Sequence, residues 1–335
     1  MISSDRTSEL NRPINLGDAM LTDALVAALR ARGNQAIAAD FGEPRHGGGE
    51  DRLQLSGPGA LLRAMRDFDG IVIGGGTLLQ DDARDVPGGW GGLPRLCAAS
   101  TVIARATRTR VAFYGVGCDP VERFGARALL RLAVKGVPVW VRDAKSASRV
   151  SHTLKGNAIV GADASLLMGF DPRGEAADDA PIVVALNGEH ARHLKVEHLD
   201  ELKRSGRRLV FLNMSQGGSF MDASALSKQA RAAFDEVTGP LDWDEAFRLI
   251  RSAESVWGSR MHALYAAMLS GVPMVALSEL PKVVTFAEDF VIPRVDDTSG
   301  MADVRPGMAD AAALSAAVAT ADSTLDDLLL AFRGR

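Results

Sequence analysis

Cysteine is scarce in this sequence, in which Cys97 and Cys118 are the only two among 335 residues. Two thiols are too few for a disulfide framework or a cysteine-rich zinc site. A basic surplus is also lacking, since 38 Lys and Arg stand against 42 Asp and Glu and the formal net charge is −4. Without excess positive charge a protein is poorly suited to the phosphates of nucleic acid. We therefore expect neither a disulfide-rich scaffold nor a nucleic-acid partner.

Long apolar runs are absent as well. No stretch of the sequence approaches the roughly 18 consecutive apolar residues that a membrane helix needs. Residues 1–13 are polar and contain no apolar core of a signal peptide. We expect a cytoplasmic protein with at most peripheral contact with a membrane.

Common catalytic and metal-binding signatures are missing too. The sequence has no G-x-G-x-x-G, P-loop lysine, G-x-S-x-G or H-E-x-x-H. His190, His193 and Glu197 have the spacing of one helical face, but intervening cations favour a solvated polar segment over a zinc site. Cys118 follows a predicted strand, and a buried structural thiol is favoured over a nucleophile because no partner can be paired with it. We predict no metal.

The length and the alternation of elements predict two α/β domains. Short apolar strands alternate with helical patterns, and the rhythm restarts after an acidic, proline-containing stretch at 169–181. We predict Rossmann-like domains at 1–170 and 181–335 that face a ligand cleft, with the last helix, 309–332, packing back on the first. Loops are predicted at 45–59 and 85–94. The predicted strands are 70–73, 111–117, 137–141, 158–161, 182–186, 208–214, 255–257 and 274–277. Among the predicted helices are 223–234 and 243–252, which separate strands of the second domain.

The stretch 255–273 is predicted to form a strand, a tight turn and a helix that stops at Gly271. Ser259 is the expected helix cap, and an apolar stripe of helical period follows it. Arg260 and His262 flank that stripe in the first turn, where free N–H groups favour an anion. The pattern indicates chemistry on an anionic substrate; the alternative is a surface arginine and a hydrogen-bonded histidine at a helix start.

Further polar or glycine-rich groups follow predicted strands. Gly74-Gly75-Gly76-Thr77 comes directly after the strand 70–73, where glycines let a ligand approach the backbone and Thr77 can cap a helix. The alternative is a turn packed tightly for its own sake. Arg142-Asp143 and Asp163 follow the strands 137–141 and 158–161, at the edge where open α/β sheets bind ligands. Near the amino terminus, Asp18 is the predicted cap of another helix.

The order and spacing of these motifs resemble the polysaccharide pyruvyl transferase family over roughly residues 15–290. The motifs are Asn15-x-Gly17-Asp18, Gly74-Gly75-Gly76-x-Leu78-x-x-Asp81, Val141-Arg142-Asp143-x-x-Ser146, Asp163, Arg260-Met261-His262-Ala263, Gly271-x-Pro273 and Pro281-Lys282-Val283. The resemblance implies two Rossmann-like domains facing a cleft, as in B-type glycosyltransferases.

The resemblance also implies a reaction. Such enzymes transfer the carbon skeleton of phosphoenolpyruvate, a co-substrate and not a cofactor, to two hydroxyls of a sugar as a ketal. The acceptor is a cell-surface polysaccharide precursor, free or lipid-linked. The resemblance makes His262 the general acid/base and Arg260 a ligand for the donor's phosphate or carboxylate. The expected substrate-binding residues are Asn15, Gly17, Asp18, Gly75, Gly76, Thr77, Ser259 and Lys282. We expect Asn15, Asp18 and the turn 74–77 on the cleft wall opposite Arg260, as acceptor contacts.

The chain departs from the family pattern at two places. The apolar strand directly before Asn-x-Gly-Asp is reduced to Arg12-Pro13-Ile14, and Leu186-Asn187-Gly188 stands where the family commonly has an arginine. Arg192 is a candidate substitute. These departures keep two alternatives open: a sugar-nucleotide-dependent glycosyltransferase whose Arg260 holds the diphosphate, and a non-catalytic glycan-binding relative.

Overall fold

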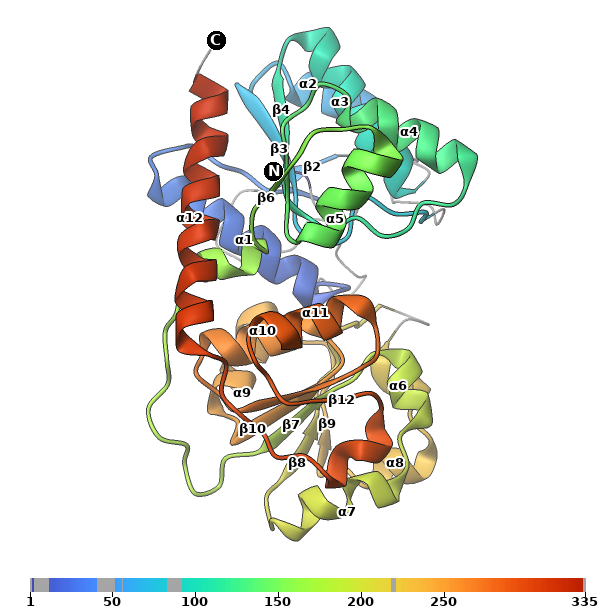
Figure 1. The fold of residues 1–335 in the computed structure, drawn as a ribbon, viewed down its shortest axis with the longest axis vertical. Helices are drawn as coiled ribbons and strands as arrows, with labels where there is room; N and C mark the ends of the chain where they lie inside the picture. Colours follow the sequence, from blue (N-terminus) through green and yellow to red (C-terminus); the bar gives the residue numbers. More distant parts are fainter. Residues whose placement is uncertain are drawn as a thin grey trace. The chain divides into compact units, whose positions relative to one another are not determined.

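Two compact units make up the chain. The computed structural model describes residue 2 and residues 12–40, 52–55, 57–82, 92–217 and 221–333. One unit contains Met1–Asn11, Leu21–Leu167 and Ala317–Arg335, and the other contains Arg12–Met20 and Met168–Ala316 (Figure 1). Helices α1 (Leu16–Ala31) and α12 (Ala311–Arg333) each contribute residues to both units.

The first unit is built on a four-stranded parallel sheet in the order β3-β4-β5-β6. Its strands are β3 (Gly70–Gly74), β4 (Arg110–Val116), β5 (Val139–Val141) and β6 (Ala158–Val160). The short strands β1 (Ala39–Asp40) and β2 (Leu53–Gln54) pair in parallel. Ile2 forms bridges to both Ala39 and Ile73, so it takes the place of a strand between β1 and β3.

Helices cover both faces of this sheet, because its strands are apolar at nearly every position. Leu96 of α3, Leu130 of α4 and Val139 belong to one core cluster. Leu21 of α1, Tyr114 and Leu325 of α12 belong to another, and the Tyr114 hydroxyl donates to the Ala321 carbonyl at 2.7 Å. The helical elements besides α1 and α12 are α2 (Pro58–Ala64), α3 (Leu93–Thr107), α4 (Phe124–Val134), α5 (Ala144–Arg149), η1 (Val150–Leu154) and η2 (Ala164–Met168).

The second unit has a six-stranded parallel sheet in the order β12-β11-β10-β7-β8-β9. The strands are β7 (Ile182–Ala185), β8 (Leu209–Phe211), β9 (Glu236–Val237), β10 (Ser255–Gly258), β11 (Met274–Leu277) and β12 (Arg294–Val295). The helical elements are α6 (Gly188–His193), α7 (Val196–Arg204), η4 (Asp222–Ala225), α8 (Lys228–Ala232), α9 (Trp243–Ser252), α10 (Met261–Leu269), α11 (Pro281–Asp289) and η5 (Thr298–Ala302). The prediction of an α/β fold with parallel sheets is confirmed.

The domain limits of 1–170 and 181–335 remain a prediction, and the compact units differ from them in one respect. Residues 12–20 precede the first sheet in sequence but pack with the second unit. Ile14 accounts for part of this, because its carbonyl accepts from the Gln216 amide at 2.7 Å. The first expected domain is thus interrupted near its start, and Ala317–Arg335 returns to the first unit.

Several local predictions were wrong. The expected helix over 223–234 is a short 3₁₀ turn, η4, followed by the five-residue helix α8. His190 and His193 lie on α6 while Glu197 lies on α7, so the three residues do not share one helical face. Helix α1 begins at Leu16, which places Asp18 in its first turn instead of at its cap. Residues 45–51 and 85–91 of the two expected loops lie outside the described ranges, whereas residues 53–54 form β2 and α3 starts at Leu93.

The described part of the chain lacks both a metal-binding cluster and a membrane-spanning helix. Its residues contain no group of three or more His, Cys, Asp or Glu side chains arranged to hold a metal ion. None of its helices combines the length and the apolar character that crossing a bilayer requires.

Candidate functional site

One of the two central strands of the second sheet, β10, leads directly into α10. The Ser259 and Arg260 amides donate to the Ala185 carbonyl at 3.0 and 3.2 Å, which fixes the turn between them against β7. Every α10 residue except His262 is buried, so the expected apolar stripe is too narrow a description. His262 is the one residue of α10 that is only partly buried.

Ser259 does not cap α10 as expected. The helix begins at Met261, and Arg260 occupies the cap position without a side-chain capping bond. The Ser259 hydroxyl instead accepts from the Asn187 amide at 2.8 Å. Ser259 therefore ties the carboxyl end of β7 to that of β10.

Arg260 pairs with a carboxylate that the sequence did not single out. Its Nε donates to Oδ2 of Asp222 at 3.0 Å, and its Nη2 donates to Oδ1. The Asp222 side chain is wholly buried, whereas that of Arg260 is 26% exposed. Burial raises the pKa of Asp222, and Arg260 opposes that shift. No local pattern marks Asp222, because the pairing joins η4 to α10 across 38 positions of sequence.

His262 contacts the Asn15-x-Gly17-Asp18 motif. A Cβ atom at Gly17 would overlap Nδ1 of His262 and lie 2.8 Å from its Cγ. The turn is held by Asn15, whose Oδ1 accepts from the Gly17 amide at 3.0 Å and whose Nδ2 donates to Asp18 Oδ2 at 3.1 Å. This motif lies in the second unit together with Arg260. Residues 15–18 thus pack with the second unit although they fall within the predicted first domain.

Aromatic side chains pack beside His262. The Tyr265 ring stacks near it with centroids 6.1 Å apart and planes inclined by 27°. Tyr265 in turn meets Phe286 of α11 edge-on at 4.7 Å. Lys282 is exposed on the first turn of α11. A substrate contact by Lys282 stays a prediction.

The first unit gathers its motif residues at the carboxyl ends of β3, β4, β5 and β6. Gly75 and Gly76 are buried and adopt left-handed backbone angles, with φ of 77° and 66°. The expected helix after Thr77 is absent from residues 78–82, which contain no helical turn. The Thr77 hydroxyl accepts instead from Nη2 of Arg142 at 3.2 Å. The guanidinium lies over Gly117, where a Cβ atom would come within 2.8 Å of its Cζ.

Carboxylates surround Arg142, whose side chain is only 6% exposed. Its Nη1 lies 3.9 Å from Oδ2 of the buried Asp163, and its Nε donates to Asp143 at 3.4 Å. Asp143 also caps α5 by accepting from the Ser146 amide at 2.6 Å. The cluster presents hydroxyl and carboxylate groups near the half-buried Thr77, which suits hydrogen bonding to polar ligands.

The residues around Arg260 and His262 and the residues around Arg142 belong to one family pattern. The model of the polysaccharide pyruvyl transferases matches residues 15–280, a span that holds both. The chain belongs to the polysaccharide pyruvyl transferase family. Membership implies a transferase activity.

Solved structures with the fold of this pyruvyl transferase family member include sugar-nucleotide enzymes. A UDP-GlcNAc 2-epimerase from Methanocaldococcus jannaschii has a TM-score of 0.59 at 12% identity, covering 98% of this chain and 99% of that one. A putative UDP-N-acetylglucosamine 2-epimerase from Listeria monocytogenes also has a TM-score of 0.59, at 10% identity and coverages of 99% and 95%. A glycosyltransferase from Rickettsia africae has a TM-score of 0.54 at 11% identity, with coverages of 99% and 95%. These likenesses show a fold like that of B-type glycosyltransferases. No curated protein matches the sequence.

Asn187 follows β7, where the family commonly has an arginine, and its side chain supplies no cation. Asn187 accepts at Oδ1 from the His190 amide at 2.9 Å and lies 3.0 Å from His190 Nδ1. Burial lowers the pKa of His190, which works against a permanent cation at this position. Arg192 is exposed on α6. Its role as a substitute stays a prediction.

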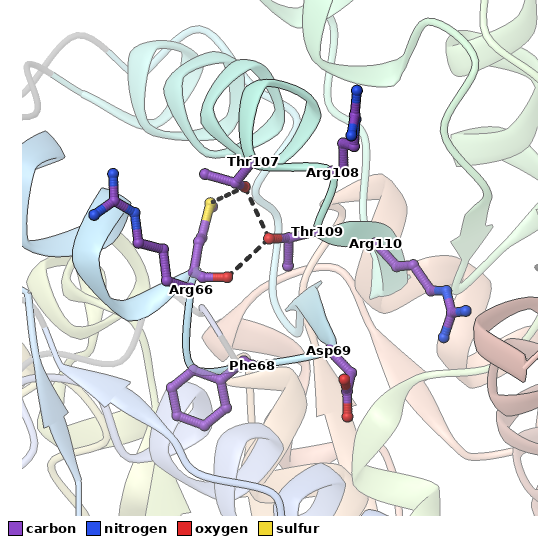
Figure 2. A pocket seen from close by; sticks show the side chains of 8 residues that line it. Arg66, Phe68, Asp69, Thr107, Arg108, Thr109 and Arg110 are labelled. Atoms are coloured by element: carbon purple, nitrogen blue, oxygen red, sulfur yellow. Dashed lines mark hydrogen bonds between the residues drawn. The ribbon is translucent and has the colours of Figure 1, made fainter.

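Two remaining features lie apart from the transferase motifs. Burial raises the pKa of Cys118 to about 12, which opposes a nucleophilic role. A cavity of about 420 Å³ lies in the first unit, and Figure 2 shows the side chains that line it. Its lining residues are Met65, Arg66, Phe68, Asp69, Thr107, Arg108, Thr109 and Arg110. It adjoins the amino ends of β3 and β4, the edge opposite the motifs, so we leave it outside the candidate site.

Proposed function

We propose that this protein transfers the pyruvyl group of phosphoenolpyruvate to two hydroxyls of one sugar in a cell-surface polysaccharide precursor. The observation that carries the proposal is the placement of Arg260 and His262 at the start of α10, beside the Asn15–Asp18 turn, in a member of this family. A cation, an imidazole and a helix N-terminus together suit an anionic substrate.

The chemistry requires one proton at carbon. Protonation of the methylene carbon of phosphoenolpyruvate creates a methyl group and an oxocarbenium-like centre at the neighbouring carbon. Two sugar hydroxyls bond to that centre, the carbon–oxygen bond to phosphate breaks, and inorganic phosphate leaves. The two hydroxyl protons balance the proton taken up by carbon and the one carried away by hydrogen phosphate.

His262 is the general acid/base in this scheme. Imidazole gives and accepts protons near neutral pH, so one residue can protonate the methylene carbon and later take a hydroxyl proton. Gly17 makes room for the ring, and the Tyr265 stack restricts it. Arg260 binds the donor's phosphate or carboxylate through the N–H groups that Asp222 leaves available.

The remaining predicted residues bind substrate or support the site in this proposal. Asn15 and Asp18 act on the His262 side because they belong to the second unit. Gly75, Gly76 and Thr77 bind the sugar acceptor, which the hydroxyl and carboxylate groups around Arg142 suit. Ser259 supports the Asn187 backbone and Lys282 supplies a further cation.

A sugar-nucleotide-dependent glycosyltransferase is the second candidate. The likeness to enzymes named UDP-GlcNAc 2-epimerase and glycosyltransferase favours it at the level of fold. Arg260 would then hold a diphosphate.

Doubly labelled phosphoenolpyruvate separates the two candidates. The protein is incubated with donor labelled in carbon and in phosphorus, together with a cell extract that supplies glycan. We expect the carbon label to appear in an acid-labile glycan ketal while labelled inorganic phosphate is released. Transfer of sugar from a UDP-sugar, with no carbon label in glycan, would replace this proposal with the second candidate.

A further inference from the structure

Asp222 lies outside every motif, yet its buried carboxylate is paired directly with Arg260. It opens the short turn η4, and its side chain is wholly buried. Donors meet both of its oxygens: Oδ2 accepts from the Ser215 amide and from Arg260 Nε, both at 3.0 Å, and Oδ1 accepts from Arg260 Nη2. Ser215 also forms the bridge to Asn15. The carboxylate therefore joins the Arg260 side chain to the backbone that holds the Asn15–Asp18 turn.

We propose that Asp222 is a positioning residue that fixes the Arg260 guanidinium for the anionic donor; this inference rests on the function proposed above. A guanidinium has five N–H groups in one plane. Asp222 takes the edge formed by Nε and Nη2, and within the described ranges the other N–H groups meet no acceptor. The edge formed by Nη1 and Nη2 remains for a phosphate or carboxylate, which it can bind with two parallel hydrogen bonds.

Positioning explains Asp222 better than charge does. A buried carboxylate beside Arg260 cancels part of the arginine's positive charge, which by itself weakens attraction for an anion. Its benefit is orientation, since a free arginine loses rotamer entropy when it binds and a fixed one does not. The two views predict opposite results. If Asp222 only reduced charge, removing its charge would strengthen donor binding.

Asp222→Asn tests the difference with little change of shape. Both carboxylate oxygens accept from N–H donors. In asparagine one of the two positions carries an NH₂ group, which faces an N–H group and cannot accept from it, so the two parallel hydrogen bonds to Arg260 cannot both form. We expect phosphoenolpyruvate to bind about tenfold more weakly and kcat to fall about tenfold, since donor and reacting carbon are misplaced. Glu254→Gln is the matched control. It disrupts the Arg207–Glu254 pair just before β10, at the opposite end of that strand, and should leave affinity and kcat unchanged.

A double-mutant cycle with Arg260→Ala separates positioning from stability. If Asp222 acts through Arg260, Asp222→Asn should change donor affinity and kcat no further in the Arg260→Ala background, although melting temperatures differ. Equal losses in both backgrounds, or an Asp222→Asn protein with near-normal affinity and turnover, would overturn the inference. Tighter donor binding by Asp222→Asn would overturn it in favour of charge reduction.

A readout independent of activity keeps this test distinct from that of the proposed function. In the wild-type protein the Arg260 Nε–H should give a solvent-protected NMR resonance, assigned by its loss in Arg260→Lys. Asp222→Asn should abolish the protection. If wild type neither binds nor uses phosphoenolpyruvate, the proposed function fails; an Nε–H that stays protected in Asp222→Asn instead overturns the fixed pairing itself.

Discussion

At the scale of single residues, the site depends on one glycine. Gly17 belongs to the Asn15-x-Gly17-Asp18 motif and to α1, yet its α-carbon faces the His262 ring. A side chain there is excluded by the imidazole and not by backbone angles, because Gly17 has no positive φ. The absence of a side chain at Gly17 therefore allows the Asn15–Asp18 turn to pack directly against His262, the candidate acid/base.

Gly17→Ala should displace His262 and slow turnover. The added methyl overlaps Nδ1, so the ring or the turn must move. We expect kcat to fall about a hundredfold, the scale of a misplacement near 1 Å, with about 1–3 kcal/mol of lost stability. Steady-state kinetics and thermal denaturation measure both. Gly125→Ala in α4, where a Cβ meets nothing within 4 Å, is the control and should keep full activity. Unimpaired turnover in Gly17→Ala would show that the packing of Gly17 against His262 is not needed for catalysis.

Both cysteines should be unreactive in the folded protein. Burial raises the pKa of Cys97 and of Cys118 to about 12, so thiolate is almost absent at pH 8 and grows only as the pH approaches that value. A chromogenic disulfide reagent at pH 8 should label neither thiol rapidly, and both should react once urea unfolds the chain. Rapid labelling of Cys118 in the native protein would reopen a role for it as a nucleophile.

The sequence predicted individual residues unevenly, for a physical reason. Arg260 and His262 stand out because their positions in a strand–turn–helix pattern are local. Asp222 and Ser215 could not be found, because the bonds that give them meaning join segments distant in sequence. Ser259 was assigned to the nearer of two possible partners: a helix cap is a local feature, whereas its bond to Asn187 spans 72 positions.

At the scale of elements, α11 ends in an unfavourable conformation. Val291, directly after its cap Phe290, has φ of 54° and is 70% exposed. The left-handed region is costly for a β-branched side chain. This end matters because Phe290 and Phe286 of the same segment pack against Tyr265 beside His262.

Val291→Gly should stabilise the protein. Relief of about 1–2 kcal/mol of left-handed strain exceeds the added flexibility of glycine, about 0.5–1 kcal/mol. We expect a net gain below about 1 kcal/mol, a rise in Tm of a few degrees at most. Val102→Gly, at an exposed position inside α3, should instead lower Tm. A lower Tm for Val291→Gly as well would contradict this account of the α11 end.

Element prediction succeeded where packing and periodicity agreed. The strand 274–277 and the helix 243–252 occur with the expected bounds, since apolar runs and a capping box are strong local signals. The helix expected at 223–234 failed because Asn213 and Ser227 bind the backbone amides of Ala223 and Ala230 and so hold two short turns in place of one helix. The predicted apolar stripe of α10 underestimated its buried surface, because alanines on the other faces of the helix are buried as well.

At the scale of the whole molecule, the chain passes between its two units four times. A linear division into halves could not anticipate this, because composition and alternation describe neighbours in sequence. Residues 12–20 join the second unit through the bridge from Asn15 to Ser215, and α12 joins the first through Leu325 and Tyr114.

A nick within 169–181 should therefore leave the two fragments associated. The segment is mostly exposed, so limited proteolysis can reach it. The amino-terminal fragment keeps residues 12–20 packed in the second unit, and the carboxyl-terminal fragment keeps α12 packed in the first. Size-exclusion chromatography should give one peak in buffer and two in urea. Two peaks in buffer would show that the packing of residues 12–20 and of α12 contributes little to holding the fragments together.

The central claim is that His262 performs proton transfer on a donor held by Arg260. The most direct measurement is the turnover of phosphoenolpyruvate by His262→Gln, with donor affinity and Tm determined on the same preparation. We predict affinity within a few-fold of wild type and a rate lower by roughly 10²–10⁴, the range for losing a general acid/base. A folded His262→Gln protein with near-normal turnover would remove His262 from the mechanism.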